Sequence, residues 1–128
     1  MVRFYAATLA GAMLLSMGIA GAAQADEGDA AAGQKVFNAC KACHTIEAGG
    51  PNRVGPNLHG VFGRKAGAVE SFKYSDAIKN SGLTWDEATL NEYLKDPKGK
   101  IPGNRMAFSG VKDDKQRADL TAYLKKQL

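Results

Sequence analysis

The residues best suited to chemistry in this chain are two cysteines and a histidine, in the order Cys40-Lys41-Ala42-Cys43-His44. Two thiols separated by two residues and followed at once by an imidazole are typical of covalent haem attachment, in which each sulfur forms a thioether with a haem vinyl group. The adjacent histidine then binds the iron from one face. The motif therefore predicts one covalently attached haem c, held by Cys40 and Cys43, with His44 as an axial ligand.

A redox dithiol and a structural disulfide are the alternative interpretations of the two cysteines. Cys40 and Cys43 are the only cysteines of the chain, which excludes a zinc site built from four thiolates. A thioredoxin-like dithiol is expected near strands that alternate with helices, and the sequence has no such pattern. The haem interpretation is favoured, and the two alternatives stay open at this point.

A six-coordinate haem iron needs a second axial ligand, for which Met106 is the candidate. Three of the four methionines lie within the first 25 residues, so Met106 is alone in the rest of the chain. It ends the segment IPGNRM, a loop shaped by proline and glycine that can present a thioether. An arbitrary methionine is more often core filler, and His59 is the rival ligand, although a hydrogen-bonded loop histidine is its more ordinary role.

The ligand pair decides the class of function. His/Met ligation raises the reduction potential of the iron and fills both axial positions, which favours electron transfer over oxygen or peroxide chemistry. We therefore expect an electron carrier and not an enzyme. If Met106 is not a ligand, the alternative is a haem protein with an open site.

The first 25 residues have the features of a secretory signal peptide. Arg3 is followed by an uncharged run from Phe4 to Ala23 that is rich in alanine, leucine and methionine, and Ala23-Gln24-Ala25 fits an A-x-A cleavage site. We predict that residues 1–25 are cleaved, leaving residues 26–128 as one exported, periplasmic domain. An uncleaved membrane anchor is the alternative, because about 20 apolar residues can span a bilayer.

The charge balance limits the possible partners. Removal of Arg3 takes the number of lysines and arginines from 17 to 16 against 13 acidic residues, which leaves a net charge of about +3. Binding to nucleic acid usually requires a concentrated basic stripe, so we expect no nucleic-acid partner. A modest basic patch is compatible with docking on acidic redox proteins.

Helical signals surround the motif, and no stretch alternates with period two for long enough to predict a strand. The expected helical segments are Asp29 to Cys40, Ser75 to Asn80, a segment that the capping box Thr84-x-x-Glu87 opens and Asp96-Pro97 closes, and a last helix that begins near Asp113-Asp114 and carries Leu120, Tyr123, Leu124 and Leu128 on one face. Gly33 lets another helix approach the first one closely. After His44 the chain is expected to form a loop in which the carbonyl of Pro56 accepts a proton of the His44 ring.

These motifs together resemble the mitochondrial-type class I cytochromes c, and in particular their exported bacterial relatives, the cytochrome c2 group. The resemblance extends from about Gly28 to Lys126, and the segments that carry it are CKACHT, GPNLHGVFGRKAG, FKYSDA, the stretch Trp85 to Leu94, IPGNRMAF and RADLTAYLKK. It implies an all-α fold of short helices wrapped around one covalently bound haem. It also implies Met106 as the sixth ligand and a crossing of the first and last helices at Gly33.

The resemblance implies further roles for individual residues. The residues expected to contact the haem or its ligands are Pro56 at His44, Tyr93 near the Met106 sulfur, Leu58, Leu90, Leu94, Phe108 and Leu124 along the haem, and Arg64, Tyr74 and Trp85 near the propionates. The chain departs from mitochondrial relatives at Asn104, Arg105 and Ile78, which stand in place of threonine, lysine and asparagine.

The resemblance also implies a function. We expect a soluble, monomeric carrier that takes electrons from a membrane quinol-oxidising complex of the bc1 type and passes them to a terminal oxidase or a photosynthetic reaction centre. Transient docking on these membrane proteins is expected to use Arg53, Lys98, Arg105 and Lys112. A membrane-tethered carrier is the alternative if the N-terminal segment is retained.

Overall fold

The computed structural model describes residues 28–128, and the expected signal peptide and its cleavage site lie outside this range. The helices of the described part are α1 (Ala30–Phe37), α2 (Asp76–Lys79), α3 (Glu87–Lys95), α4 (Pro97–Lys100) and α5 (Asp114–Lys125). Extended pairing in residues 28–128 is limited to a single bridge between Lys65 and Thr84. The expected all-α fold class is therefore confirmed.

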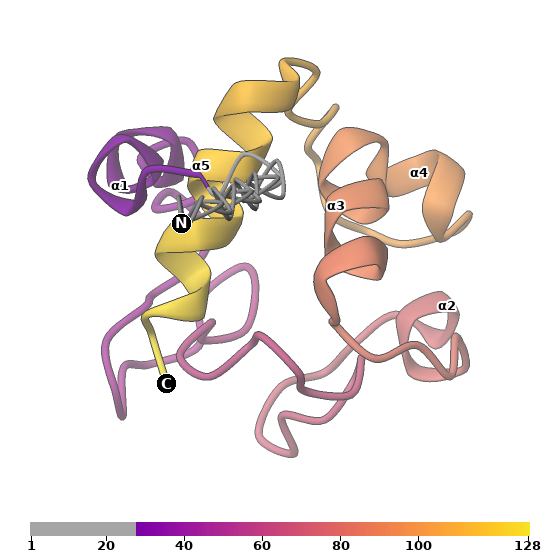
Figure 1. Ribbon diagram of the computed structural model, residues 1–128. Coiled ribbons are helices and arrows are strands. Elements are labelled where there is room, and N and C mark those ends of the chain that lie inside the picture. The colour runs from indigo at the N-terminus through magenta and orange to yellow at the C-terminus, as the bar shows by residue number, and fades with distance from the viewer. Residues whose placement is uncertain (1–27) are drawn as a thin grey trace, which may run out of the picture.

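The first and last helices cross and form the main contact between elements, as Figure 1 shows for α1 in indigo and α5 in yellow. Gly33 lies at this crossing, where a Cβ atom would fall 1.9 Å from the carbonyl oxygen of Asp119. One turn later the rings of Phe37 and Tyr123 pack with their centroids 5.4 Å apart. Phe37 and Leu120 are each 1% exposed, so the missing side chain of Gly33 allows a tightly packed core to form.

The helix α3 begins at a different cap from the one that the sequence indicated. The expected capping box of Thr84 and Glu87 does not form, because Thr84 lies in the bridge with Lys65. Asp86 is the cap, and its Oδ1 accepts the backbone N–H of Thr89 at 2.8 Å. A carboxylate is as good a cap as a hydroxyl, and its position two residues later shortens the helix.

The Asp96-Pro97 pair ends α3, as expected, but it also begins α4, which was not expected. The Oδ1 of Asp96 accepts the backbone N–H of Gly99 at 3.0 Å, and Pro97 occupies the first turn of α4, where its missing N–H costs nothing. An aspartate followed by proline is thus a start signal as well as a stop signal.

The expected position of Leu128 on the inner face of the last helix is wrong. The helix α5 ends at Lys125, and Leu128 is 80% exposed. Beyond the helix, the carbonyl of Gln127 accepts the backbone N–H of Gly60 at 2.5 Å. This contact ties the C-terminus to the loop that follows the cysteine motif.

The segment between α1 and α2 has no helix and is ordered by side-chain hydrogen bonds instead. The Nδ2 of Asn57 donates to the Oγ1 of Thr45 at 2.8 Å and to the carbonyl of Glu47 at 2.9 Å. The backbone N–H of Asn57 donates to the Oδ1 of Asn52 at 2.9 Å. These bonds fix the turn that presents Pro56. Among residues 28–128, no helix has the length and the apolar character needed to cross a membrane.

Candidate functional site

The imidazole of His44 is held in one orientation by its neighbours. Its Nδ1 lies 2.7 Å from the carbonyl oxygen of Pro56, which is the hydrogen bond expected from the sequence. Gly55 packs against the ring so closely that a Cβ atom would fall 2.2 Å from the His44 Cε1. Burial lowers the pKa of His44, although the bond to Pro56 opposes this effect. A neutral ring that donates from Nδ1 leaves the Nε2 lone pair available for a metal.

The two cysteines just after α1 are free thiols and do not form a disulfide. Cys40 and Cys43 are both partly buried, and a turn in which the backbone N–H groups of Cys43 and His44 donate to the carbonyl of Cys40 holds them together. Burial, with a smaller effect of Cys43, raises the pKa of the Cys40 thiol to about 11. The alternative of a structural disulfide between Cys40 and Cys43 is therefore not met, and both sulfurs are available for covalent attachment.

Met106 lies in a loop without regular structure between α4 and α5, and is partly buried against the core. The hydroxyl of Tyr93, from α3, donates to the Met106 Sδ over 3.9 Å. Burial raises the pKa of Tyr93 to about 12, so the hydroxyl stays protonated and remains a donor at ordinary pH. The structure thus gives the methionine sulfur a defined polar neighbour.

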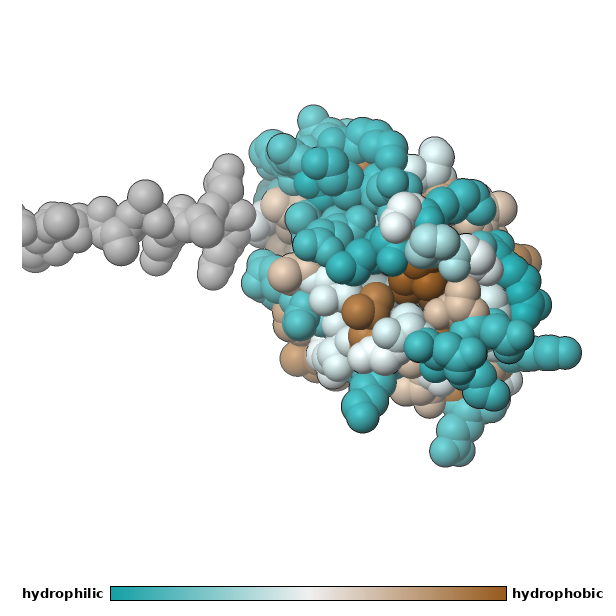
Figure 2. All heavy atoms as spheres, turned by 90° about the vertical axis from the view of Figure 1, so that its right-hand side faces the viewer, coloured by the Kyte–Doolittle hydropathy of each residue, from teal (hydrophilic) through white to brown (hydrophobic). Residues whose placement is uncertain are grey.

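Many of the expected haem contacts belong to one apolar cluster. The buried members of this cluster include Trp85, Leu90, Leu94 and Leu124. The members that are only partly buried against them include Leu58, Met106, Phe108 and Cys40. Figure 2 shows apolar atoms at the bottom of a recess with a hydrophilic rim, on the right-hand side of the molecule in Figure 1. An apolar surface that a folded chain leaves partly uncovered marks a ligand site, and its character suits the flat, apolar haem.

The donor set of the described residues also fits a haem better than a bare metal ion. Within residues 28–128 there is no group of three or more histidine, cysteine or acidic side chains that could hold a metal ion. Iron with only His44 and Met106 as protein ligands requires further ligands, and a porphyrin supplies four. The site therefore fits an iron that arrives inside a haem.

Arg64, which is expected near the haem propionates, is half-buried. Arg64 donates from Nη1 to the carbonyl of His59 at 3.1 Å and from Nη2 to that of Asn57 at 3.2 Å. Its Nε is buried and has no hydrogen-bond partner among the described residues. Burial lowers the pKa of Arg64, against a smaller effect of Tyr74. A carboxylate at this Nε would satisfy the buried donor and pair with the half-buried charge.

The other two residues expected near the propionates have defined contacts. The hydroxyl of Tyr74 accepts the backbone N–H of Val69 at 3.1 Å. Trp85 is 8% exposed, and its ring packs on that of Tyr93 at a centroid distance of 4.8 Å. The rival ligand His59 is placed by its Nδ1, which lies 3.2 Å from the carbonyl oxygen of Ile46, and this matches the expected hydrogen-bonded loop histidine.

The four residues expected to dock partners are all exposed and fall into two groups. Arg53 lies beside the cysteine motif, since its Nη1 donates to the carbonyl of Lys41 at 3.4 Å. The other three are near the methionine loop. Lys98 borders the same surface hollow as Phe108, Arg105 precedes Met106, and Lys112 donates to the carbonyl of Lys95 at 2.6 Å.

The comparison with known families decides what this arrangement is. The sequence model of the family "Cytochrome c" matches residues 30–127, which is nearly the whole described part of the chain. The chain belongs to the cytochrome c family. Its members are electron carriers with a covalently attached haem c and are not enzymes, so the chain is an electron-transfer haem protein that works with redox partner proteins.

Similar proteins of the family show to which group of cytochromes c the chain belongs. The chain is 56% identical over 97 residues to cytochrome c2 of Blastochloris viridis, with 76% of each chain covered. It is 55% identical over 95 residues to cytochrome c-550 of Bradyrhizobium diazoefficiens, covering 74% of this chain and 70% of the relative. These matches confirm the class I cytochrome c assignment and the cytochrome c2 group.

A solved structure confirms the fold. Cytochrome cH from Methylobacterium extorquens superposes with a TM-score of 0.73 at 54% sequence identity, covering 77% of this chain and 99% of that chain. The cytochrome c fold of this chain is thereby established.

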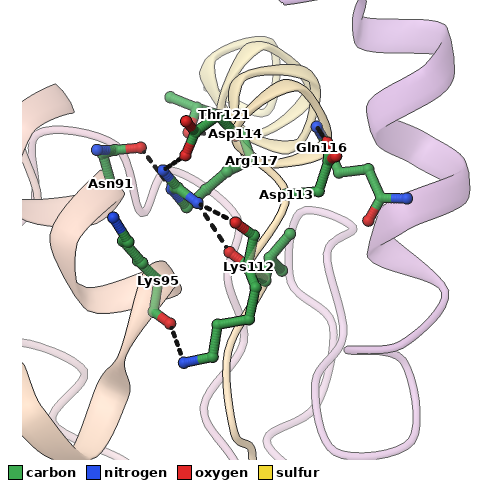
Figure 3. A network of polar contacts seen from close by, with 9 residues as sticks. Asn91, Lys95, Lys112, Asp113, Asp114, Gln116, Arg117 and Thr121 are labelled. Atoms are coloured by element: carbon green, nitrogen blue, oxygen red, sulfur yellow. Dashed lines mark hydrogen bonds and ion pairs between the residues drawn. The ribbon is translucent and has the colours of Figure 1, made fainter.

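Sequence reasoning missed a buried network around Arg117, which holds the far end of the methionine loop (Figure 3). Arg117 is 4% exposed. Its Nε donates to the Oδ1 of Asn91 on α3 at 2.7 Å. Its Nη1 donates to the carbonyls of Val111 at 2.9 Å and Lys112 at 3.3 Å, and its Nη2 pairs with the Asp114 carboxylate at 2.5 Å. An arginine between apolar positions of an amphipathic helix was the available signal, because such a residue must find acceptors.

Proposed function

We propose that the protein is a periplasmic carrier that takes single electrons from a membrane quinol-oxidising complex of the bc1 type and delivers them to a terminal oxidase or a photosynthetic reaction centre. The observation that carries this proposal is that the chain holds both an oriented His44 ring and, on another loop, a methionine sulfur that has its own hydrogen-bond donor. In this proposal His44 and Met106 would be the two protein ligands of the haem iron.

Each of the two ligands has a support that keeps it in place. The carbonyl of Pro56 accepts from Nδ1 of His44, which leaves Nε2 free to bind an iron. The Tyr93 hydroxyl orients the Met106 thioether. A bound haem would supply a one-electron couple, and with both residues as ligands it would have no open position for oxygen or peroxide.

The remaining site residues hold and shield the cofactor. Cys40 and Cys43 attach it through thioethers, and Leu58, Leu94 and Phe108 cover its apolar faces. Arg64, with Tyr74 and Trp85 near it, would meet the propionates, and a carboxylate there would satisfy the buried, unpartnered Nε of its half-buried guanidinium. Exclusion of water from the iron raises the reduction potential.

Docking uses the exposed positive residues beside the cysteine motif and the methionine loop. One of these residues, Arg53, lies beside the segment that attaches the haem. The other three lie near the segment that provides the sixth ligand, and they are Lys98, Arg105 and Lys112. Each charge alone contributes little, but together they raise the rate of encounter with an acidic partner. The interaction is transient, and the carrier works as a monomer.

The proposed location in the periplasm rests on the N-terminal segment. Residues 1–25 act as a signal peptide that is removed on export, which leaves a soluble domain of residues 26–128 in the periplasm. Mass spectrometry of the exported protein measures the cleavage directly. A mass that retains the segment would support the membrane-tethered carrier instead.

Stopped-flow kinetics with purified membrane complexes tests the proposed electron path. We expect fast reduction by a bc1-type complex and fast re-oxidation by an oxidase or a reaction centre, both in second-order reactions. The partner that re-oxidises the protein fastest identifies the acceptor. Failure of all of these complexes to exchange electrons with the haem at an appreciable rate would contradict the proposal.

A further inference from the structure

One buried amide side chain links the methionine loop to α4. Asn104 is 6% exposed. Its Nδ2 donates to the carbonyl oxygens of Pro97 and Ile101, each at 2.8 Å. Its Oδ1 accepts the backbone N–H of Met106 at 3.0 Å. The side chain therefore joins both ends of a short helix to the backbone of the candidate ligand.

An amide suits this position better than the other small polar side chains. It carries two N–H donors on one side and an acceptor on the other, and all three are used here. A hydroxyl group has one hydrogen and can satisfy only one of the carbonyls of Pro97 and Ile101. Since the site is buried, each donor or acceptor left without a partner would destabilise the loop.

We propose that Asn104 is a positioning residue that determines how firmly Met106 holds the sixth coordination position of the iron. The inference rests on the ligation proposed above. Rotation of the Met106 backbone would break a partly buried hydrogen bond to a side chain that two carbonyls hold in place. Asn104 thus acts on the backbone of the ligand, whereas Tyr93 acts on its sulfur.

The test compares holo-protein variants by the binding of carbon monoxide and by the methionine-to-iron charge-transfer band. Asn104→Ala removes all three hydrogen bonds, and Asn104→Ser is a milder change that keeps only a short hydroxyl. Thr121→Val is the matched control, because it removes a buried hydrogen bond of α5, from the Thr121 Oγ1 to the carbonyl of Arg117 at 3.0 Å. Thermal unfolding is measured for each variant.

Carbon monoxide binds ferrous iron only after the methionine sulfur dissociates from it. The association rate of carbon monoxide therefore measures how readily Met106 leaves the iron. We expect Asn104→Ala to raise this rate at least about tenfold, the equivalent of about 1.4 kcal/mol, and to weaken the charge-transfer band. The serine variant should fall between the two proteins. The control should unfold at a lower temperature with an unchanged rate and band.

Two results would overturn the inference. One is wild-type carbon monoxide binding in both Asn104 variants. The other is an equal rise in the Thr121→Val control, which would show a general loss of stability in place of a specific effect on the ligand. A wild-type protein that lacks the band and binds carbon monoxide at once would refute the proposed ligation, and this inference with it.

Discussion

The hydroxyl of Tyr93 lies 3.9 Å from the sulfur of Met106, and it connects the middle of α3 to the methionine loop. The two residues are thirteen positions apart in the sequence, and their contact places a proton donor on an atom that we propose as an iron ligand. A donor on the sulfur withdraws electron density from it. The contact should therefore affect the reduction potential as well as the packing.

Replacing Tyr93 by phenylalanine should lower the reduction potential. Without the donor the sulfur is a stronger electron donor, which favours ferric iron. A hydrogen bond of about 1 kcal/mol corresponds to a shift of up to about 40 mV for a one-electron couple. Redox titration measures the shift, with Tyr123→Phe as the control, since Tyr123 packs on Phe37. An equal shift in both variants would contradict the role of the Tyr93 hydroxyl.

Gly33→Ala should destabilise the crossing of α1 and α5. The new Cβ would lie 1.9 Å from the carbonyl oxygen of Asp119, so the helices must separate. Overpacking of this kind costs about 1–3 kcal/mol, which exceeds the gain in helix propensity of about 1 kcal/mol. Chemical denaturation measures the loss, and the exposed Gln34→Ala is the control. A Gly33→Ala protein as stable as the wild type would show that the crossing is loose.

Asp119 should make the protein more stable at neutral than at acidic pH. The backbone N–H of Asp29, 2.7 Å from Oδ1, and then the ammonium of Lys115 lower the pKa of Asp119. A carboxylate whose pKa is lower in the folded state stabilises the fold above its unfolded pKa. This contribution is lost as the pH falls through the folded pKa.

Thermal unfolding from pH 7 to pH 2 tests this linkage. The Asp119→Asn variant should unfold at a lower temperature than the wild type at neutral pH, and the difference should shrink on acidification. Glu70→Gln, which removes an exposed carboxylate, serves as the control. If the difference in unfolding temperature between Asp119→Asn and the wild type stays constant with pH, the charge of Asp119 does not stabilise the fold.

The chain without its haem should be largely unfolded. Several apolar residues of the core cluster, among them Leu58, Met106 and Phe108, are only partly buried by the protein itself. A domain of about 100 residues has a small free energy of unfolding. A ligand that only the folded state binds increases this free energy. A haem-free Cys40→Ala, Cys43→Ala variant should lose most of its helical circular dichroism, and a cooperative transition near that of the holo-protein would disprove this.

Electron transfer to an acidic partner should slow with salt. Lys98→Glu should lower the second-order rate at low salt, and the rates of the two proteins should converge near 0.1 M salt, where the screening length is about 10 Å. Lys35→Glu on α1 provides the control, because in Figure 1 α1 and α4 lie on opposite sides of the molecule. Equal effects of both substitutions would show that only net charge matters.

The haem motif and the main helices were predictable because their signals are local. Cys40, Cys43 and His44 are adjacent in the chain, and the caps Asp29 and Asp113 stand next to the helices that they begin. Even the bond from His44 to Pro56 followed from a nearby proline whose carbonyl was free. In these parts of the chain, residues that are close in the sequence are also close in space, so their spacing predicts their contacts.

The features that sequence reasoning missed depend on which groups meet in space. Thr84 and Asp86 are both good caps, and the bridge from Thr84 to Lys65 decides between them. The bond of Arg117 to Asn91 joins residues 26 positions apart, and Asn104 reaches the carbonyls of Pro97 and Ile101 only after α4, which was not expected, has formed. Their buried polar character becomes informative only once the acceptor carbonyls are placed.

The central claim is that His44 and Met106 together fill the coordination sphere of a covalently bound haem. The most direct measurement is the visible absorption spectrum of the purified ferrous protein before and after exposure to carbon monoxide at neutral pH. We predict the spectrum of a low-spin, six-coordinate haem that carbon monoxide does not change within minutes. An immediate change to the spectrum of a carbon monoxide complex would contradict the claim, because it would reveal an open iron site and a haem protein of another function.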